Sequence, residues 1–289
     1  MTRVCLSALL AALGVASLYA SQPTFRSGVA IVRVDASVMD GNRPVAGLTK
    51  DNFTITDNGI PQTLDTVSLD TVPLGLMLLL DTSESLEGAA MRALAGAARG
   101  LVQSLRPDDA AALMLFADQV RLAVPATRER PAMLSAIANL SAAGATSIND
   151  AVVLSLLHEP TVAPDMRPVM MVFTDGRDTA SWLTSDQAQQ AARRSRTLIH
   201  VVELRTVAGS GTNFARELAR AGGGRVWSAT SASALRQLFG DVLNELRARY
   251  LITYYPSGVS REGWHDVKVR IKGAHGDVTA RPGYFVATQ

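Results

Sequence analysis

Nearly uninterrupted apolar runs in the middle of the chain most constrain its fold. Leu74–Leu80 and Val169–Phe173 are apolar at successive positions, and Leu198–Val202 is apolar except at His200, so each predicts a strand buried on both faces. Amphipathic helical patterns lie between such runs. The clearest places Met91, Leu94, Ala98, Leu101, Val102 and Leu105 on one face of a helix. The alternation predicts an α/β domain with a parallel sheet covered on both sides.

The segments on either side of this region have a β pattern. Val32, Val34, Ala36 and Val38 alternate with polar residues, and the tripeptide Asp57-Asn58-Gly59 predicts a hairpin because Asn-Gly accepts positive φ. Alternation returns after the last predicted helix, which Ser231 or Ser233 is placed to cap. It involves Tyr250, Ile252 and Tyr254, and then Val267, Val269 and Ile271. We therefore expect the two ends of the chain to form one small β-rich module.

The first twenty residues have the pattern of an export signal. Arg3 precedes an apolar stretch from Val4 to Leu18, which is shorter than the roughly 20 residues that span a bilayer, and Ala20 suits a signal peptidase. The single cysteine, Cys5, lies inside this segment, so the mature chain would have no disulfide. The expected organisation is a signal peptide at 1–20, an N-terminal β-rich segment at 21–72, the α/β domain at 73–246 and C-terminal β-strands at 247–289. We expect an exported protein, periplasmic or extracellular, with no transmembrane helix in the mature chain.

The composition fits a globular protein and gives no reason to expect a nucleic-acid partner. The 289 residues are 47% hydrophobic and 19% charged, and their formal net charge of +2 is close to neutral. One main domain with a smaller module is the expectation for this length.

Polar motifs follow the predicted strands at the edge where open parallel sheets place their ligand sites. Asp81-Thr82-Ser83-Glu84-Ser85 follows the first buried strand, and Thr174-Asp175-Gly176 follows a later one. Gly144-Ala145-Thr146-Ser147 precedes a helix that starts near Ile148. Carboxylate and hydroxyl oxygens suit Mg²⁺ and are poor ligands for zinc or copper. With few negative ligands, the ion would still attract a carboxylate from a partner protein.

The three motifs resemble the metal-ion-dependent adhesion site of the von Willebrand factor A superfamily. The resemblance implies a Rossmann-like, mostly parallel sheet with one short antiparallel strand, which Gln119–Val124 could supply. It also implies that the metal ligands are Asp81, Ser83, Ser85, Thr146 and Asp175, with Mg²⁺ (or Mn²⁺ or Ca²⁺) as the ion and a protein carboxylate as the external ligand. We expect the Asp81 carboxylate to face a solvent-open site.

The flanking segments resemble those of exported bacterial VWFA-related domain proteins. The similarity lies in Val45-Ala46-Gly47-Leu48-Thr49, Asp51-Asn52-Phe53, Arg249-Tyr250 and Arg281-Pro282-Gly283-Tyr284. The resemblance then covers nearly all of the mature chain.

Other readings of these residues stay open. A Mg²⁺-dependent phosphohydrolase could use Asp81 as nucleophile and Asp175 or Asp178 as a metal ligand, but Ser83 stands where a proton-delivering carboxylate is usual. A structural envelope protein could carry a vestigial site. No Gly-x-Ser-x-Gly supports a serine hydrolase, so we expect a binding protein and not an enzyme. Asp150 is expected to be a helix-start residue, and Asp178 either binds a metal-bound water or lies in a solvated loop.

The signal sequence gives a first prediction. Cleavage after Ala20 would make Ser21 the mature N-terminus. The mass of the intact protein from its native host should lack residues 1–20. A mass that includes them would instead indicate an N-terminal anchor.

Overall fold

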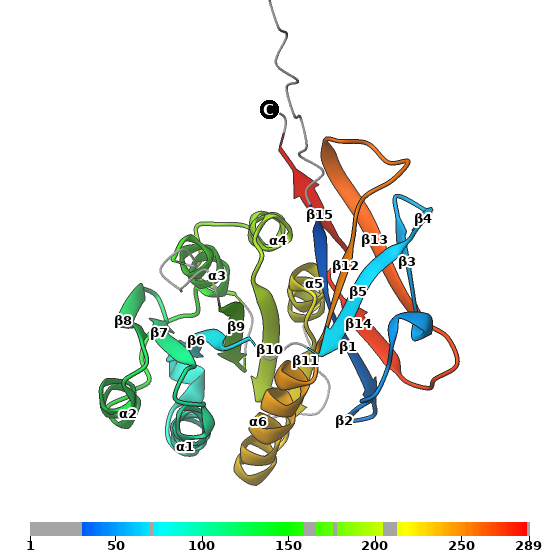
Figure 1. Ribbon diagram of the computed structural model, residues 1–289. Coiled ribbons are helices and arrows are strands. Elements are labelled where there is room, and N and C mark those ends of the chain that lie inside the picture. Colours follow the sequence, from blue (N-terminus) through cyan, green and yellow to red (C-terminus); the bar gives the residue numbers. More distant parts are fainter. Residues whose placement is uncertain (1–30, 70–71, 159–165, 176–177, 205–212, 288–289) are drawn as a thin grey trace, which may run out of the picture.

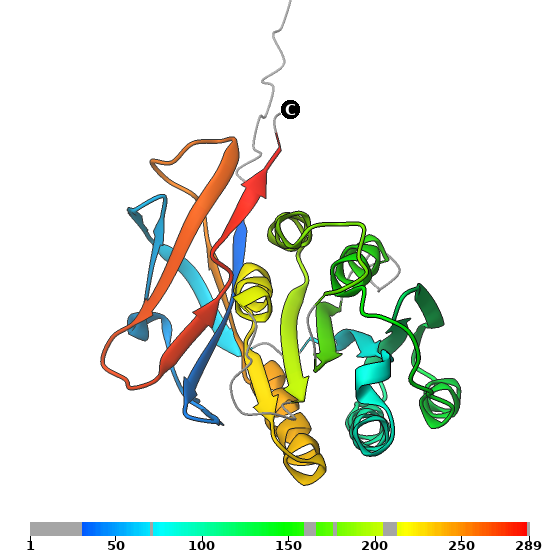
Figure 2. The same cartoon turned by 180° about the vertical axis from the view of Figure 1, so that it is seen from behind.

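A computed structural model describes residues 31–69, 72–158, 166–175, 178–204 and 213–287, so the expected signal peptide lies outside the described residues. Figure 1 shows an α/β domain and a β-rich module side by side, and Figure 2 shows them from behind. The N- and C-terminal segments of the chain both contribute to the module, while the middle of the chain forms the α/β domain.

The α/β domain is built on a six-stranded sheet in the order β11-β10-β9-β6-β7-β8. Its strands are β6 (Leu74–Asp81), β7 (Ala110–Phe116), β8 (Val120–Thr127), β9 (Arg167–Thr174), β10 (Leu198–Leu204) and β11 (Val226–Ala229). Neighbouring strands are parallel except for β8, which is antiparallel to β7 at the sheet edge. The predicted mixed sheet is confirmed, with the antiparallel strand close to the expected Gln119–Val124.

Helices cover both faces of this sheet (Figure 1). They are α1 (Ala89–Ser104), α2 (Arg130–Ala138), α3 (Ile148–Leu157), α4 (Ser185–Arg194), α5 (Asn213–Gly222) and α6 (Ala232–Arg247). Helices α1, α2 and α6 share one apolar core with alternate residues of β6 such as Leu76 and Leu78. The intervening residues, Met77 and Leu79, pack with α3, α4 and α5 on the other face. All eight residues of β6 are buried. The apolar run predicts this for Leu74–Leu80, but not for Asp81 at the end of the strand.

The β-rich module is a pair of sheets made from both flanks. One sheet runs β14-β1-β12-β5, with β2 paired to β1, and the other runs β15-β13-β3-β4. The strands are β1 (Val32–Asp40), β2 (Arg43–Pro44), β3 (Phe53–Asp57), β4 (Ile60–Gln62), β5 (Leu64–Leu69), β12 (Tyr250–Tyr254), β13 (Gly263–Ile271), β14 (Asp277–Ala280) and β15 (Gly283–Val286). Strand β1 pairs with β12 and β14, and β3 pairs with β13. The predicted association of the two ends is confirmed by these registers.

Local signals in the sequence form the expected turns and caps. Asn58 and Gly59 have φ of 47° and 81°, the positive values that a tight hairpin between β3 and β4 requires. Of the two serines considered as the cap of α6, Ser231 is the one that accepts a hydrogen bond from the N–H of Ala234 (3.1 Å). The glycines after α5 end that helix, and Gly224 lies so close to β10 that a Cβ would meet the Ile199 carbonyl oxygen.

Arg249 connects the module to the α/β domain through a buried network. Its guanidinium forms ion pairs with Glu245 of α6 and with Asp35 of β1 (3.2 Å). It also donates to the carbonyl oxygens of Gly223 (3.1 Å) and Thr279 (3.4 Å). Arg167, at the start of β9, forms a second ion pair with Asp35 (3.0 Å). Elements from both parts of the molecule therefore meet at one fully buried arginine.

Glu245 is the buried carboxylate of this network. Burial acts to raise the pKa of Glu245, but His200 and Arg249 outweigh it and hold that pKa well below its usual range. Nδ1 of His200 accepts a hydrogen bond from Trp227 Nε1 (3.0 Å), and Nε2 of the same ring lies 3.1 Å from Glu245 Oε2. The guanidinium of Arg249 donates to the other carboxylate oxygen of Glu245, Oε1.

Among the described residues, no helix is long and apolar enough to cross a membrane.

The network gives a second prediction, for Glu245→Gln. Because the pKa of Glu245 is lower in the folded chain than the ordinary value of about 4.3, its contribution is complete above that pH and is lost as the pH falls below it. At neutral pH the variant should lose about 3 kcal/mol in the free energy of unfolding, since Arg249 loses a buried partner. The difference between variant and wild type in the free energy of unfolding should become smaller below pH about 4.

Urea unfolding across this pH range measures the effect, with Glu262→Gln as a control at an exposed glutamate. A difference that is independent of pH would contradict the assignment of an ionised Glu245.

Candidate metal centre

The pairing of β6 with β9 brings two of the predicted motifs together. The register places Leu80 opposite Phe173, so Asp81 and Thr174 are the next pair at the carboxyl edge of the sheet. Asp175 follows directly after β9, and the turn with Ser83 and Ser85 follows β6. The sequence forms this edge because both strands are apolar up to the point where the polar motifs begin.

Hydrogen bonds join four of the five predicted ligands into one group. Asp81 Oδ1 accepts from the N–H of Ser83 (2.9 Å). Ser83 Oγ lies 3.0 Å from Ser85 Oγ, and Ser85 Oγ donates to Asp175 Oδ1 (2.9 Å). The group thus contains two carboxylates and two hydroxyls from two neighbouring strand ends.

The fifth predicted ligand, Thr146, lies on a loop that packs against this group through its main chain. The N–H of Glu84 donates to the Gly144 carbonyl (3.0 Å), and the N–H of Ala143 donates to the Thr82 carbonyl (2.8 Å). Within the described residues, the hydroxyl of Thr146 makes no hydrogen bond to the other four predicted ligands. The structure therefore brings the loop to the site, while the direct contacts involve the other four residues.

Gly144 is required where this loop meets the turn between β7 and β8. It has a φ of +79°, and a Cβ there would lie 2.7 Å from Asp118 Oδ1. A residue with a side chain would be strained and would also displace Asp118.

The position of Asp81 differs from the expectation of a solvent-open carboxylate. Its side chain is 0% exposed, and Ser83 beside it is 1% exposed, because Asp81 is the last residue of a central strand and is covered by its own turn. Ser85 is exposed and Asp175 is partly buried, so the site opens to solvent on their side. The expectation that Asp81 itself faces solvent was wrong.

Electrostatics make Asp81 an unusual residue. Burial raises the pKa of Asp81, and the nearby Asp175 adds to this, while hydrogen bonds from Ser83 and Thr174 act in the opposite direction. Among the described residues, none of the ion pairs involves Asp81 or Asp175. A buried carboxylate without a cationic partner is costly, and a divalent cation would supply the missing charge.

The donor set also fits a hard cation. All the candidate ligand atoms are carboxylate or hydroxyl oxygens, the donors that Mg²⁺ and other hard cations take. Within the described residues no group of three or more His, Cys, Asp or Glu could hold a metal ion, so a cation here would depend on the hydroxyls as well as on the two carboxylates. Asp81 and Asp175 supply the negative charge, and serine and threonine hydroxyls would complete the coordination.

Thr174, to which the sequence motif gave no role, also belongs to this group. Its Oγ1 donates to Asp81 Oδ2 (2.7 Å), so it fixes the second oxygen of the buried carboxylate. The signal available in the sequence was its position as the last residue of a buried strand, next to the strand that ends in Asp81.

The two further aspartates considered earlier serve the surrounding loops. Asp178 accepts hydrogen bonds from the N–H groups of Asn149 (2.9 Å) and Ser181 (3.1 Å). Asp150 lies in the first turn of α3, as expected, and accepts from the N–H groups of Trp182 and Leu183 (both 2.9 Å). Both carboxylates are thus used to hold the loop between β9 and α4.

Comparison with known proteins identifies the domain. Residues 76–177, which include all five predicted ligands, match the family model of the von Willebrand factor type A domain. The chain therefore contains a von Willebrand factor type A (VWA) domain. The predicted VWA resemblance of this part of the chain and its α/β fold are confirmed.

Solved structures and a curated relative agree with this at low sequence identity. A von Willebrand factor type A protein from Catenulispora acidiphila has a TM-score of 0.55 and 13% identity, and the similarity covers 89% of this chain and 74% of that one. The PilB minor pilin from Streptococcus sanguinis has a TM-score of 0.52 and 12% identity over 63% of each chain. These likenesses show the fold alone. An uncharacterized protein from Synechocystis is 28% identical over 109 residues, which are 37% of this chain and 26% of that protein, so the chain spans about a quarter of that relative.

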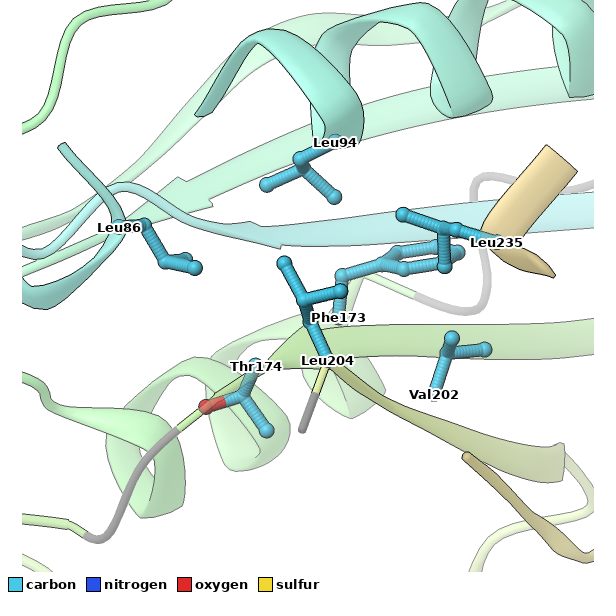
Figure 3. A pocket seen from close by; sticks show the side chains of 7 residues that line it. All are labelled: Leu86, Leu94, Phe173, Thr174, Val202, Leu204 and Leu235. Carbon is cyan, nitrogen blue, oxygen red and sulfur yellow. The ribbon is translucent and has the colours of Figure 1, made fainter. Parts of the chain in front are cut away.

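A small apolar cavity lies beside the candidate metal site of the VWA domain (Figure 3). It has a volume of about 10 Å³ and is lined by Leu86, Leu94, Phe173, Thr174, Val202, Leu204 and Leu235. In Figure 3 the Thr174 oxygen points away from the apolar side chains. A cavity of this size and lining can hold neither a ligand nor a well-bonded water, so it is a gap in the core packing.

The Thr174–Asp81 bond gives a third prediction. Thr174→Val keeps the shape of the side chain but removes the donor, and leaves a buried carboxylate oxygen without that partner. In EDTA, the free energy of unfolding should fall by about 1–3 kcal/mol. Thr174→Ser, which retains the hydroxyl, should lose less. Urea unfolding measures the stability of both variants. If Thr174→Val is as stable as wild type, the hydrogen bond does not contribute to stability.

Proposed function

We propose that the VWA domain binds a divalent cation, Mg²⁺ or else Mn²⁺ or Ca²⁺, through Asp81, Ser83, Ser85, Thr146 and Asp175. The observation that carries the proposal is the hydrogen-bonded group of four of these residues at the sheet edge, with a buried Asp81 that has no cationic partner among the described residues. A bound cation would supply positive charge and an open coordination position for an outside oxygen. Asp81 and Asp175 would hold the ion, and Thr174 would orient Asp81.

We further propose that the outside oxygen is a carboxylate of a partner protein, an Asp or Glu side chain. Neutral hydroxyl ligands leave much of the cation's charge uncompensated, which favours an anionic ligand. Ser85 is exposed and Asp175 partly so, and this gives such a ligand access. The protein would then act by binding and would not turn over a substrate.

The residues present favour binding over phosphoryl transfer. Ser83, at the position where an aspartyl-phosphate enzyme usually has its proton-delivering carboxylate, has its Oγ next to Ser85 and its N–H on Asp81. The lysines of the chain are Lys50, Lys268 and Lys272, all outside the α/β domain, so none is available to neutralise a phosphoryl intermediate. Asp178 is engaged with Asn149 and Ser181.

Export is part of the proposal. The run from Val4 to Leu18 has the length of a signal segment, and the flanks resemble exported VWFA-related proteins. We place the working protein in the periplasm or outside the cell.

Calorimetric titration with Mg²⁺ gives the fourth prediction. Asp175→Ala is the main variant, because Asp175 is only partly buried and its loss should leave the fold intact. We expect the affinity for Mg²⁺ to fall at least about tenfold, since hard cations depend on negative charge in the site. Ser85→Ala, which removes a neutral oxygen, should weaken binding less. Asp81→Asn should act like Asp175→Ala if circular dichroism shows it folded.

Asp186→Ala is the matched control, because it removes an exposed carboxylate from the first turn of α4 without touching the group. It should bind Mg²⁺ nearly as well as wild type. Equal Mg²⁺ affinity in wild type and Asp175→Ala would support the alternative of a structural protein with a vestigial site. For the partner, retention from envelope extract in Mg²⁺ and release by EDTA is the expected result.

A further inference from the structure

Trp182 is the most exposed of the large hydrophobic residues in the described part of the chain. Its side chain is 95% exposed, whereas the next, Leu157, is 70% exposed. A tryptophan whose ring is exposed to water does not stabilise the fold by burial. Tryptophan is also among the residue types most enriched where single side chains dominate binding at protein interfaces.

The backbone around Trp182 is held firmly. The Asp150 carboxylate accepts from the N–H groups of both Trp182 and Leu183, each at 2.9 Å. Asp178 accepts from the N–H of Ser181 just before it (3.1 Å), and Thr184 just after it caps α4 with Gln187. The indole is therefore carried on a fixed segment, with the polar groups on both sides bonded.

This segment lies next to the proposed metal site. Thr146 donates its N–H to Thr179 Oγ1 (2.9 Å), and its carbonyl accepts from the N–H groups of Thr179 (2.8 Å) and Ala180 (3.0 Å). Thr179 and Ala180 come shortly before Trp182, and Asp175 begins the same connection between β9 and α4. The exposed ring is thus anchored to the loop that carries one of the proposed ligands.

Carboxylates lie beside Trp182. The Asp150 carboxylate accepts from the N–H of Trp182, and the Asp178 carboxylate accepts from the N–H of Ser181 directly before it. Asp186, in the first turn of α4, follows four residues later. Arg177, in the same connection between β9 and α4, lies outside the described residues. The carboxylates that contact this segment favour a cationic side chain beside the ring.

We infer that Trp182 is a docking platform for an arginine or lysine of the partner segment that supplies the carboxylate. The inference rests on the proposed function, and it specifies the partner as a protein segment with an acidic residue close to a basic one. The basic side chain lies over the indole face, where the ring attracts a cation within about 6 Å, and the carboxylates of Asp150 and Asp178 favour the same charge. The metal site and Trp182 would together bind a partner segment that has an acidic and a basic side chain close to each other.

A displayed random-peptide library tests this with the full mature chain as bait. Peptides are bound in Mg²⁺ and eluted with EDTA. From wild type we expect enrichment of Asp or Glu together with Arg or Lys a few residues away. On Trp182→Leu, which keeps an apolar side chain but has no ring, the acidic residue should still be enriched and the basic one should not. Trp182→Phe should keep part of the preference.

The affinity of one selected peptide for each variant measures how much Trp182 contributes to binding. Trp182→Leu should weaken it about 5- to 30-fold, the range of a cation–ring contact. Leu157→Ala, at an exposed apolar residue on the far end of α3, should leave it unchanged. Because the Trp182 side chain is exposed, the thermal unfolding of Trp182→Leu should match wild type.

The possible outcomes can be told apart. If wild type yields no acidic peptides on elution with EDTA, the proposed function is overturned. If the selected peptides are acidic but contain no enriched basic residue, the proposed metal site stands and the role of Trp182 is overturned. The same holds if they contain apolar residues instead and bind wild type and Trp182→Leu equally.

Discussion

The buried guanidinium of Arg249 holds the molecule together as one unit. It forms ion pairs with Asp35 in the module and with Glu245 at the end of α6, and it bonds the carbonyl of Gly223 after α5. A buried arginine is tolerable only when its donors are satisfied, so strand β1, helix α6 and the turn after α5 must all lie where they do. The last helix of the α/β domain is thereby fixed to a module that both ends of the chain build.

The proposed metal site is a second place where burial of a charged group costs free energy. Asp81 ends the central strand β6 and is buried without a cationic partner among the described residues. Its oxygens are held by the Ser83 N–H and the Thr174 hydroxyl, so the carboxylate is oriented before any ion arrives. A preorganised site of this kind loses little conformational entropy on binding, which favours a cation.

Much of the architecture follows from the sequence pattern. The apolar runs predicted β6, β9 and β10, and Asn58-Gly59 predicted the first hairpin, because these signals are local. Strand β7 was not predicted. Its sequence Ala110-Ala-Ala-Leu-Met-Leu-Phe116 is rich in residues with high helix propensity, and only its pairing between β6 and β8 makes it a strand.

The roles of residues that depend on tertiary contacts could not be predicted from the sequence pattern. The sequence singled out Arg249 only as part of a flanking segment that resembles VWFA-related proteins, and Asp35 and Ser37 only as polar positions of an alternating strand. In the structure Ser37 is buried and Asp35 joins Arg249. The residues of the proposed metal site were named from motif resemblance, and the structure brings four of them together in one hydrogen-bonded group. The burial of Asp81 and the bond from Thr174 required knowledge of the strand register.

The central claim is that these oxygens coordinate a divalent cation, and the most direct test is anomalous diffraction from crystals grown or soaked with Mn²⁺. The account predicts one strong anomalous peak among the side-chain oxygens of Asp81, Ser83, Ser85, Thr146 and Asp175. The hydrogen bond from Ser85 to Asp175 should then be replaced by contacts to the ion. A crystal that retains that bond and has no peak at the site, while Mn²⁺ is present in excess, would contradict the account.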